Sequence, residues 1–279
     1  MEATLPITVE RRGPVAIVWL DRPDQRNAFA PEFWTLFPNV IEEIGDDAEI
    51  RAIVVAAKGR AFTVGLDLKM FGPAMVTGNL DPAAPQPPSP VAQRAQTRRL
   101  VKTMQHTFSS LAECPKPVIA AIHGYCIGAG VDLITACDIR YASADAIFSI
   151  RETRLAMVAD VGTLQRLPSI IDPGSMAELA YTGRDFDAGE AASLGLVTRL
   201  LPDAELTVAA AVETAEMIAA NSPLAVQGTK AVLRAGDGRT VAEALDYVAL
   251  WNAAFLHSND LGEAMASFLE RRPPEFKGE

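Results

Sequence analysis

Three carboxylates stand in apolar or turn-rich segments near the middle of the chain. Asp132 lies within an apolar segment, Glu152 follows the segment FSIR, and Asp160 lies within MVADVG. A carboxyl group in apolar surroundings has a raised pKa and can exchange protons near neutral pH. Two such groups at different depths could serve as an acid and a base. Each also has a structural alternative. Asp132 could be a helix-end carboxylate and Asp160 a turn residue, while Glu152 could form an ion pair with Arg151 or Arg154.

Two glycine-containing turns could bind an anion. GYCIGAG (Gly124–Gly130) follows an apolar segment and opens a helical one, and FTVGLDL (Phe62–Leu68) occupies a similar position earlier in the chain. A helix N-terminus leaves N–H groups unpaired and carries partial positive charge, and glycine lets a ligand approach the backbone. Two such turns side by side could direct two donors at one oxyanion. The alternative is a tight strand-to-helix turn. The absence of G-x-G-x-x-G and of a Walker lysine disfavours a nucleotide site.

The elements that must position these groups begin with apolar strands. Strands are predicted at Val15–Leu20, Arg51–Ala57 and Pro117–Ile122, and apolar residues at helical spacing predict a helix over Pro31–Ile44, interrupted or kinked at Pro38. A strand, a helix and a second strand within about 40 residues form a βαβ unit. The first part of the chain therefore has a parallel or mixed sheet.

The rest of the chain is predicted to be mainly helical. Pro, Gly and Ala dominate Gly72–Pro90, which predicts an irregular, mobile loop that is either a wall of a binding site or a plain surface insertion. A boundary near 201 divides the chain into a core domain, 1–201, and a helical region, 202–279. Further short strands and helices are expected at the following segments: strands Ile139–Ala142 and Ala146–Ile150; helices Arg94–Leu111, Val131–Cys137, Ser175–Tyr181, Ala188–Leu194, Glu205–Ala220, Pro223–Arg234, Val241–Leu256 and Leu261–Arg271.

Composition excludes several classes of function. The chain of 279 residues carries a net charge of −10, which disfavours a nucleic-acid partner. Its three cysteines form no disulfide framework, and neither they nor His106, His123 and His257 have the spacing of a metal site. The N-terminal segment lacks the apolar run of a signal peptide, the longest apolar tract holds Asp132 and several glycines, and the C-terminal EFKGE matches no targeting signal. We therefore expect a cytoplasmic protein without a membrane partner.

Several longer segments together resemble one family. They are DRPDQRNAF, FTVGLDLKMF, PKPVIAAIHGYCIGAGVDLITACDIRYAS, TGRDFDAGEAASLGLVTRLLP and NSPLAVQGTK. The combination is similar to the crotonase superfamily, which is the enoyl-CoA hydratase/isomerase family, and the likeness covers nearly the whole chain. It implies an α/β fold, a spiral of ββα units followed by a helical C-terminal trimerisation region. It also implies an acyl-CoA thioester substrate and assembly as a homotrimer or homohexamer.

The three carboxylates narrow the resemblance. Asp132, Glu152 and Asp160 together resemble the trio of the dienoyl-CoA isomerase branch, whereas hydratases of the family carry a glutamate at the first of these positions and a glycine at the third. The resemblance implies an isomerase of fatty acid β-oxidation that converts a 3,5-dienoyl-CoA to a 2,4-dienoyl-CoA. A 2-enoyl-CoA hydratase using Asp132 and Glu152 around a water is the first alternative. A non-catalytic relative that binds acyl-CoA or RNA is the second, and the net charge disfavours RNA.

The resemblance also implies roles for residues. The oxyanion-hole amides fall on Leu66 and Ala129, where family members usually have glycine at the second position. Asp160 and Glu152 form the proton relay as base and acid, with their order open, and Asp132 orients the relay or shares its charge. Neither a metal nor a redox cofactor is expected, because coenzyme A is part of the substrate. Its phosphates would need local cations, for which we consider the following residues: Arg26, Lys58, Arg60, Lys69 and, reaching a neighbouring subunit, Lys277.

Overall fold

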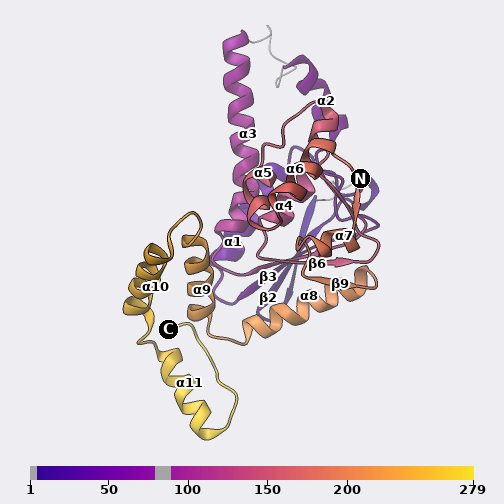
Figure 1. Cartoon of the computed structure of the whole chain (residues 1–279). Helices are drawn as coiled ribbons and strands as arrows, with labels where there is room; N and C mark the ends of the chain where they lie inside the picture. Colours follow the sequence, from indigo (N-terminus) through magenta and orange to yellow (C-terminus); the bar gives the residue numbers. More distant parts are fainter. Residues whose placement is uncertain (1–4, 79–88) are drawn as a thin grey trace.

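The computed structural model describes residues 5–78 and 89–279, and a six-stranded sheet forms its centre (Figure 1). β1 pairs antiparallel with β2, and the other neighbouring strands are parallel. The strands in spatial order are β1 (Ile7–Arg12), β2 (Val15–Leu20), β3 (Ala52–Ala57), β4 (Val118–Ile122), β6 (Ile139–Ser143) and β9 (Arg199–Leu201). The central strands are buried along their length, as parallel strands covered on both faces require.

A second, smaller sheet stands beside the first. It consists of β5 (Tyr125–Ile127), β7 (Ile147–Ser149) and β8 (Phe186–Asp187). Each of two successive units supplies one strand to the large sheet and the next to the small sheet. β4 and β5 are followed by α4 (Ala129–Thr135), while β6 and β7 are followed by a 3₁₀ turn at Glu152–Leu155. This alternation is the spiral of ββα units that we expected.

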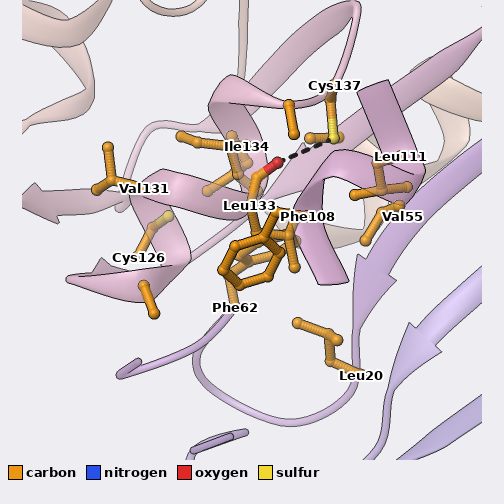
Figure 2. Close-up of a cluster of buried hydrophobic side chains, with 14 of the residues drawn as sticks. Leu20, Val55, Phe62, Phe108, Leu111, Cys126, Val131, Leu133, Ile134 and Cys137 are labelled. Carbon is orange, nitrogen blue, oxygen red and sulfur yellow. Dashed lines mark hydrogen bonds between the residues drawn. The ribbon is translucent and has the colours of Figure 1, made fainter. Parts of the chain in front are cut away.

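One face of the large sheet packs against helices that carry aromatic residues. α1 (Phe33–Asp46) and α3 (Pro90–Glu113) bury their apolar faces there, so that Phe33 and Phe108 are almost fully enclosed. Figure 2 shows the same cluster continuing through Phe62 and Leu111 to the residues of α4. Because this cluster supports both glycine turns, burial of its apolar surface stabilises the site described below.

The opposite face of the sheet is covered by α8 (Ala204–Ala219), which lies beneath it in Figure 1. Small side chains such as Ala211 and Ala215 pack against buried residues of the strands, including Val54 and Ile119. α8 therefore belongs to the packed core, although the sequence boundary near 201 places it in the helical region.

The last three helices extend away from the sheet (Figure 1). They are α9 (Pro223–Ala235), α10 (Val241–Phe255) and α11 (Asn259–Glu270). An ion pair between the buried Lys230 and the exposed Asp138 links α9 to the core, since Lys230 Nζ lies 2.7 Å from Asp138 Oδ2 and donates to the Lys116 carbonyl at 2.9 Å. Loss of Asp138 would leave the buried Lys230 ammonium without its counter-ion, so this contact helps to fix the start of the C-terminal region. The remaining helices of the core are α2 (Leu68–Thr77), α5 (Thr163–Arg166), α6 (Pro173–Thr182) and α7 (Ala188–Ser193).

Several segments differ from the sequence-based expectation, and β5, β8 and β9, like β1, were not predicted as strands. Gly72 to Thr77, which we expected to be irregular, belongs to α2, because the Asp67 carboxylate caps the helix and Phe71 is buried against the core. Pro90 is the first residue of α3, and residues 79–88 of the expected loop lie outside the described part of the chain. β1 was missed because its charged residues face solvent on an edge strand.

Candidate active site

The two glycine turns lie against each other. Thr63 N donates to the Tyr125 carbonyl at 2.8 Å, and Ile127 N donates to the Thr63 carbonyl at 3.1 Å. At Gly65, with φ +80°, an added Cβ would lie 2.6 Å from Ile127 O and 3.2 Å from Ala129 N. Only glycine therefore permits this approach, which brings the residue before Leu66 against the first residue of α4.

Each turn presents an unpaired amide to a common cavity. Phe29 N donates to Gly65 O, and Asp67 N donates to Phe29 O, which leaves the intervening Leu66 N–H outside this pairing. Ala129 is the first residue of α4, where amides have no partner within the helix. Within residues 5–78 and 89–279 neither N–H has a hydrogen-bond acceptor, and both residues line the cavity. The pair can therefore bind an oxygen that carries negative charge.

The cavity has a volume of about 730 Å³ and is largely apolar. Leu66, Ala129, Glu152 and Asp160 are all among its lining residues. α2 and α3 supply much of the remainder, and the apolar residues include Trp34, Phe71, Met75, Leu100, Val101 and Met104. This combination of apolar walls and a few polar groups suits a ligand with a hydrocarbon chain and one reactive polar end.

Glu152 lies beside the second glycine turn. An added Cβ at Gly128 would come within 3.3 Å of Glu152 Oε1, and φ at Gly128 is +56°. The other oxygen, Oε2, is buried without a hydrogen-bond partner in the described part of the chain. Burial, followed by the nearby charge of Asp132, raises the pKa of Glu152 to about 7. The structural alternative for Glu152, an ion pair with Arg151 or Arg154, is not found in the described part of the chain, where Arg151 pairs with Asp185.

Asp132 lies behind the cavity wall. It is fully buried in α4, and its Oδ1 accepts a hydrogen bond of 2.5 Å from Thr163 N, the first amide of α5. Its Oδ2 has no partner among the described residues. Burial raises the pKa of Asp132 to about 6, although the hydrogen bonds from Thr163 oppose the increase. Asp132 is not among the residues that line the cavity.

Asp160 faces the cavity from the segment that precedes α5. The residue is exposed, yet burial of its carboxyl group still raises the pKa, and its own amide opposes this increase. Its carbonyl accepts a hydrogen bond of 2.7 Å from the side-chain amide of Gln105 on α3. The structure thus brings Glu152 and Asp160 to one cavity and holds Asp132 directly behind it.

A family model described as enoyl-CoA hydratase/isomerase matches residues 10–84 and 89–279. The chain belongs to the enoyl-CoA hydratase/isomerase family. The expected recognition and the expectation of an enzyme of this family are both confirmed. Within this family, the chain is 42% identical to a peroxisomal Δ3,5-Δ2,4-dienoyl-CoA isomerase of Arabidopsis thaliana, over 99% of this chain and 98% of that protein. It is 43% identical to the mitochondrial isomerase of Dictyostelium discoideum, over 94% of this chain and 87% of that protein. It is also 43% identical to the mitochondrial isomerase of Homo sapiens, over 91% of this chain and 76% of that protein.

Solved structures of this family confirm the expected fold. An enoyl-CoA hydratase from Bacillus anthracis superposes with a TM-score of 0.88 at 31% identity, covering 99% of this chain and 100% of that one. An enoyl-CoA hydratase from Polaromonas superposes with a TM-score of 0.84 at 26% identity, covering 97% and 99%.

The expected cytoplasmic location was wrong. The three isomerases above are named as mitochondrial or peroxisomal proteins, which conflicts with it. The expectation was based on the lack of a recognisable targeting signal. That lack does not distinguish a cytoplasmic protein from a protein of an organelle. In the part of the chain that the structure describes, no helix has the length and apolar character needed to cross a bilayer.

The cations proposed for the coenzyme A phosphates do not line the cavity of this family member. Arg26 is exposed. It lies beside the cavity, because its carbonyl accepts a hydrogen bond from the amide of Val64, which lines the cavity. Lys69 is exposed in the first turn of α2. Lys277 lies in the C-terminal region, where its amide donates to Asp260 at 2.8 Å. Within one chain, the structure does not bring Lys277 to the cavity.

Sequence reasoning missed the residues of α3 that line the cavity of this family member. Thr97, Leu100, Val101 and Met104 follow the i, i+3, i+4, i+7 pattern of one helix face. That spacing marked a helix with an apolar face. The spacing does not show whether this helix face packs on the core or borders a cavity, because the elements that face it are distant in sequence.

Proposed function

We propose that this protein converts 3,5-dienoyl-CoA thioesters to 2,4-dienoyl-CoA thioesters, as one step of fatty acid β-oxidation. The relatives described above carry that activity in their names. The observation that carries the proposal is the second carboxylate on the cavity wall, Asp160, in addition to Glu152. A shift of two conjugated double bonds must remove a proton at one carbon and add one at another, so two proton-transfer groups along one cavity suit it.

In this proposal the thioester oxygen binds between the amides of Leu66 and Ala129. Removal of a proton from carbon 2 places negative charge on that oxygen and along the conjugated chain. Both amides are unpaired and border the cavity, so they are available to stabilise this charge. The acyl chain would run along the apolar wall formed by α2 and α3.

The position of Glu152 supports its assignment as the base. Its Oε1 lies beside Gly128, which directly precedes the Ala129 amide, so it is near carbon 2 of a thioester bound there. Asp160 would then protonate carbon 6, which reverses the order in which the sequence analysis named the two residues. The pKa of about 7 for Glu152 suits a base near neutral pH. Burial raises the pKa of the Asp160 carboxyl group as well.

We assign Asp132 an indirect role. Its charge raises the pKa of Glu152, and its Oδ1 holds the Thr163 amide three residues after Asp160. Three close carboxyl groups do not ionise independently, so the pKa values of this site belong to the group as a whole. The relay requires neither a metal nor a redox cofactor. In residues 5–78 and 89–279 no group of three His, Cys, Asp or Glu side chains could hold a metal ion.

A comparison of two substrates tests the proposed reaction. The protein is given a 3,5-dienoyl-CoA or a 2-enoyl-CoA, and the products are separated and identified. We expect conversion of the diene to be much faster than hydration of the 2-enoyl thioester. Fast hydration without diene isomerisation would instead establish the hydratase that the structural neighbours represent. Binding without turnover of either would identify a non-catalytic acyl-CoA-binding protein.

We also propose that the helical C-terminal region forms a homotrimer, or a homohexamer of two trimers. Large apolar side chains are exposed on α10 and α11, among them Leu250 at 70% and both Phe268 and Leu269 at 80% exposure. Apolar patches of this kind mark surfaces that a partner covers. The boundary near residue 201 would then separate the site-bearing core, 1–201, from the assembly region, 202–279, with α8 packing on the core. In such an assembly Lys277 could reach the coenzyme A of a neighbouring subunit.

A further inference from the structure

We propose that Gln105 is a positioning residue for Asp160 and thereby controls protonation at the far end of the conjugated chain. This assignment rests on the proposed function, in which Asp160 donates a proton to carbon 6. Nothing in the local sequence marks Gln105, because it lies 55 positions before Asp160. The contact exists only because α3 crosses the segment that carries the carboxylate.

The hydrogen bond from Gln105 reaches the catalytic segment at one atom. Its Nε2 donates to the Asp160 main-chain carbonyl at 2.7 Å, a normal length for such a bond. The Asp160 carboxylate in turn interacts with the amide of the same residue. The carbonyl and the carboxylate of Asp160 are therefore coupled through very few rotatable bonds, so a shift of the carbonyl moves the acid.

One hydrogen bond orients the main chain at Asp160 itself. From Val158 to Asp160, within the described part of the chain, Gln105 makes the only hydrogen bond to the main chain from another residue. The side chains of Ala159 and Val161, on either side of Asp160, are buried in the core. Further hydrogen bonds follow at Val161, whose carbonyl accepts from Arg166 at 3.4 Å, and at Thr163, whose amide is bound by Asp132. Core packing therefore holds the neighbours of Asp160, while the Gln105 hydrogen bond fixes the orientation of the Asp160 carbonyl.

α3 is a common support for the acid and for the substrate. The same helix that carries Gln105 also lines the cavity through Leu100, Val101 and Met104. A second contact joins α3 to α5, since Arg166 donates to Ser109 Oγ at 3.0 Å. An acyl chain that packs on α3 is thus placed relative to Asp160 by one rigid element, and proton transfer is sensitive to displacements of about 1 Å.

The test compares two reactions that depend on different carboxylates. Exchange of the carbon 2 proton with deuterated water reports removal and return of that proton by Glu152. Isomerisation requires, in addition, proton donation by Asp160 to carbon 6. Both are measured on 3,5-dienoyl-CoA with Gln105→Leu, which removes the donor, and with Gln105→Glu, which keeps the shape but has no donor when ionised. Gln93→Leu is the matched control, because Gln93 also donates from α3 to a main-chain carbonyl, that of Thr77.

For both Gln105 variants we expect kcat for isomerisation to fall about 10-fold, within the range that misplacement of a catalytic group produces. Exchange at carbon 2 and KM should change less than about 2-fold, and Gln93→Leu should resemble the unsubstituted protein.

Two results would overturn the assignment. Equal losses of exchange and isomerisation would indicate that Gln105 supports the fold alone. Unchanged isomerisation in Gln105→Leu would show that the hydrogen bond is dispensable. Failure of the proposed function itself is distinguishable, because the unsubstituted protein would then not isomerise the diene at all, and the assignment would fall with it.

Discussion

The buried carboxylate of Asp132 and the main-chain amide of Thr163 form a hydrogen bond of 2.5 Å. This bond ties α4, which begins at the Ala129 amide, to the turn that follows Asp160. The same carboxylate leaves its second oxygen buried without a partner in the described chain, and burial raises its pKa to about 6. Asp132 therefore connects α4 to the segment that follows Asp160. When Asp132 is ionised, its buried charge lowers the stability of the folded state.

Asp132→Asn should change how stability depends on pH. Asparagine keeps an oxygen for the Thr163 amide but cannot ionise. Because the folded-state pKa of Asp132 is raised above 3.8, the unfolded state loses its proton first as pH rises, and the folded state of the parent protein is progressively disfavoured. Between about pH 4 and pH 8 the parent should lose about 3 kcal/mol of unfolding free energy relative to the variant. Urea unfolding of both proteins across this range measures the difference, and parallel curves would contradict the raised pKa.

Glu152→Gln should remove the base at carbon 2. We expect isomerisation to fall by about 10²–10⁴-fold, the contribution typical of a positioned acid or base. Exchange of the carbon 2 proton should fall in parallel, while acyl-CoA binding, measured by calorimetry, should persist. A loss of less than about 10-fold would assign proton removal to Asp132 instead.

Asp160→Asn should separate the two proton transfers. With the acid absent, the dienolate can regain a proton only at carbon 2, so isomerisation should be abolished while exchange at that carbon continues. Coenzyme A binding should remain intact, because the amides of Leu66 and Ala129 are unchanged. Mass spectrometry of substrate recovered from deuterated water distinguishes the two steps. Unaltered turnover would remove Asp160 from the mechanism.

Ala129→Pro should test the oxyanion hole without removing a side chain that contacts substrate. Proline is accepted at the first position of a helix but has no N–H. Loss of this donor should reduce kcat by about 10²–10³-fold. Ala129→Gly is the control, since glycine retains the donor and should keep activity. Circular dichroism and thermal unfolding establish that both variants fold, and equal activities would exclude this amide from the site.

The double variant Phe268→Asp/Leu269→Asp should disrupt assembly. Both side chains are 80% exposed on α11 in the single chain, and burial of carboxylates in an apolar interface is unfavourable. Sedimentation should show trimers or hexamers for the parent protein and monomers for the variant. Arg271→Asn, at the end of the same helix, should assemble normally because asparagine accepts its positive φ. A parent protein that sediments as a monomer would refute the proposed assembly.

Much of the site could be predicted because its chemistry is local in sequence. The glycine turns and the carboxylates at 132, 152 and 160 stand in segments whose composition marks them, and apolar runs indicated β2, β3 and β4. Contacts between distant segments could not be predicted in this way. Gln105 acts on a residue far along the chain, α2 forms because Asp67 caps it and Phe71 is buried, and the position of Lys277 depends on the path of the C-terminal region.

The cavity draws its reactive end and its long wall from separate parts of the molecule. Leu66, Ala129, Glu152 and Asp160 lie in loops or at the starts of helical turns, whereas α2 and α3 supply much of the apolar lining. Substitutions on those two helices can therefore adjust which tail lengths are accepted while the chemistry of bond migration stays the same. Selectivity and reactivity can diverge independently in proteins built on this plan.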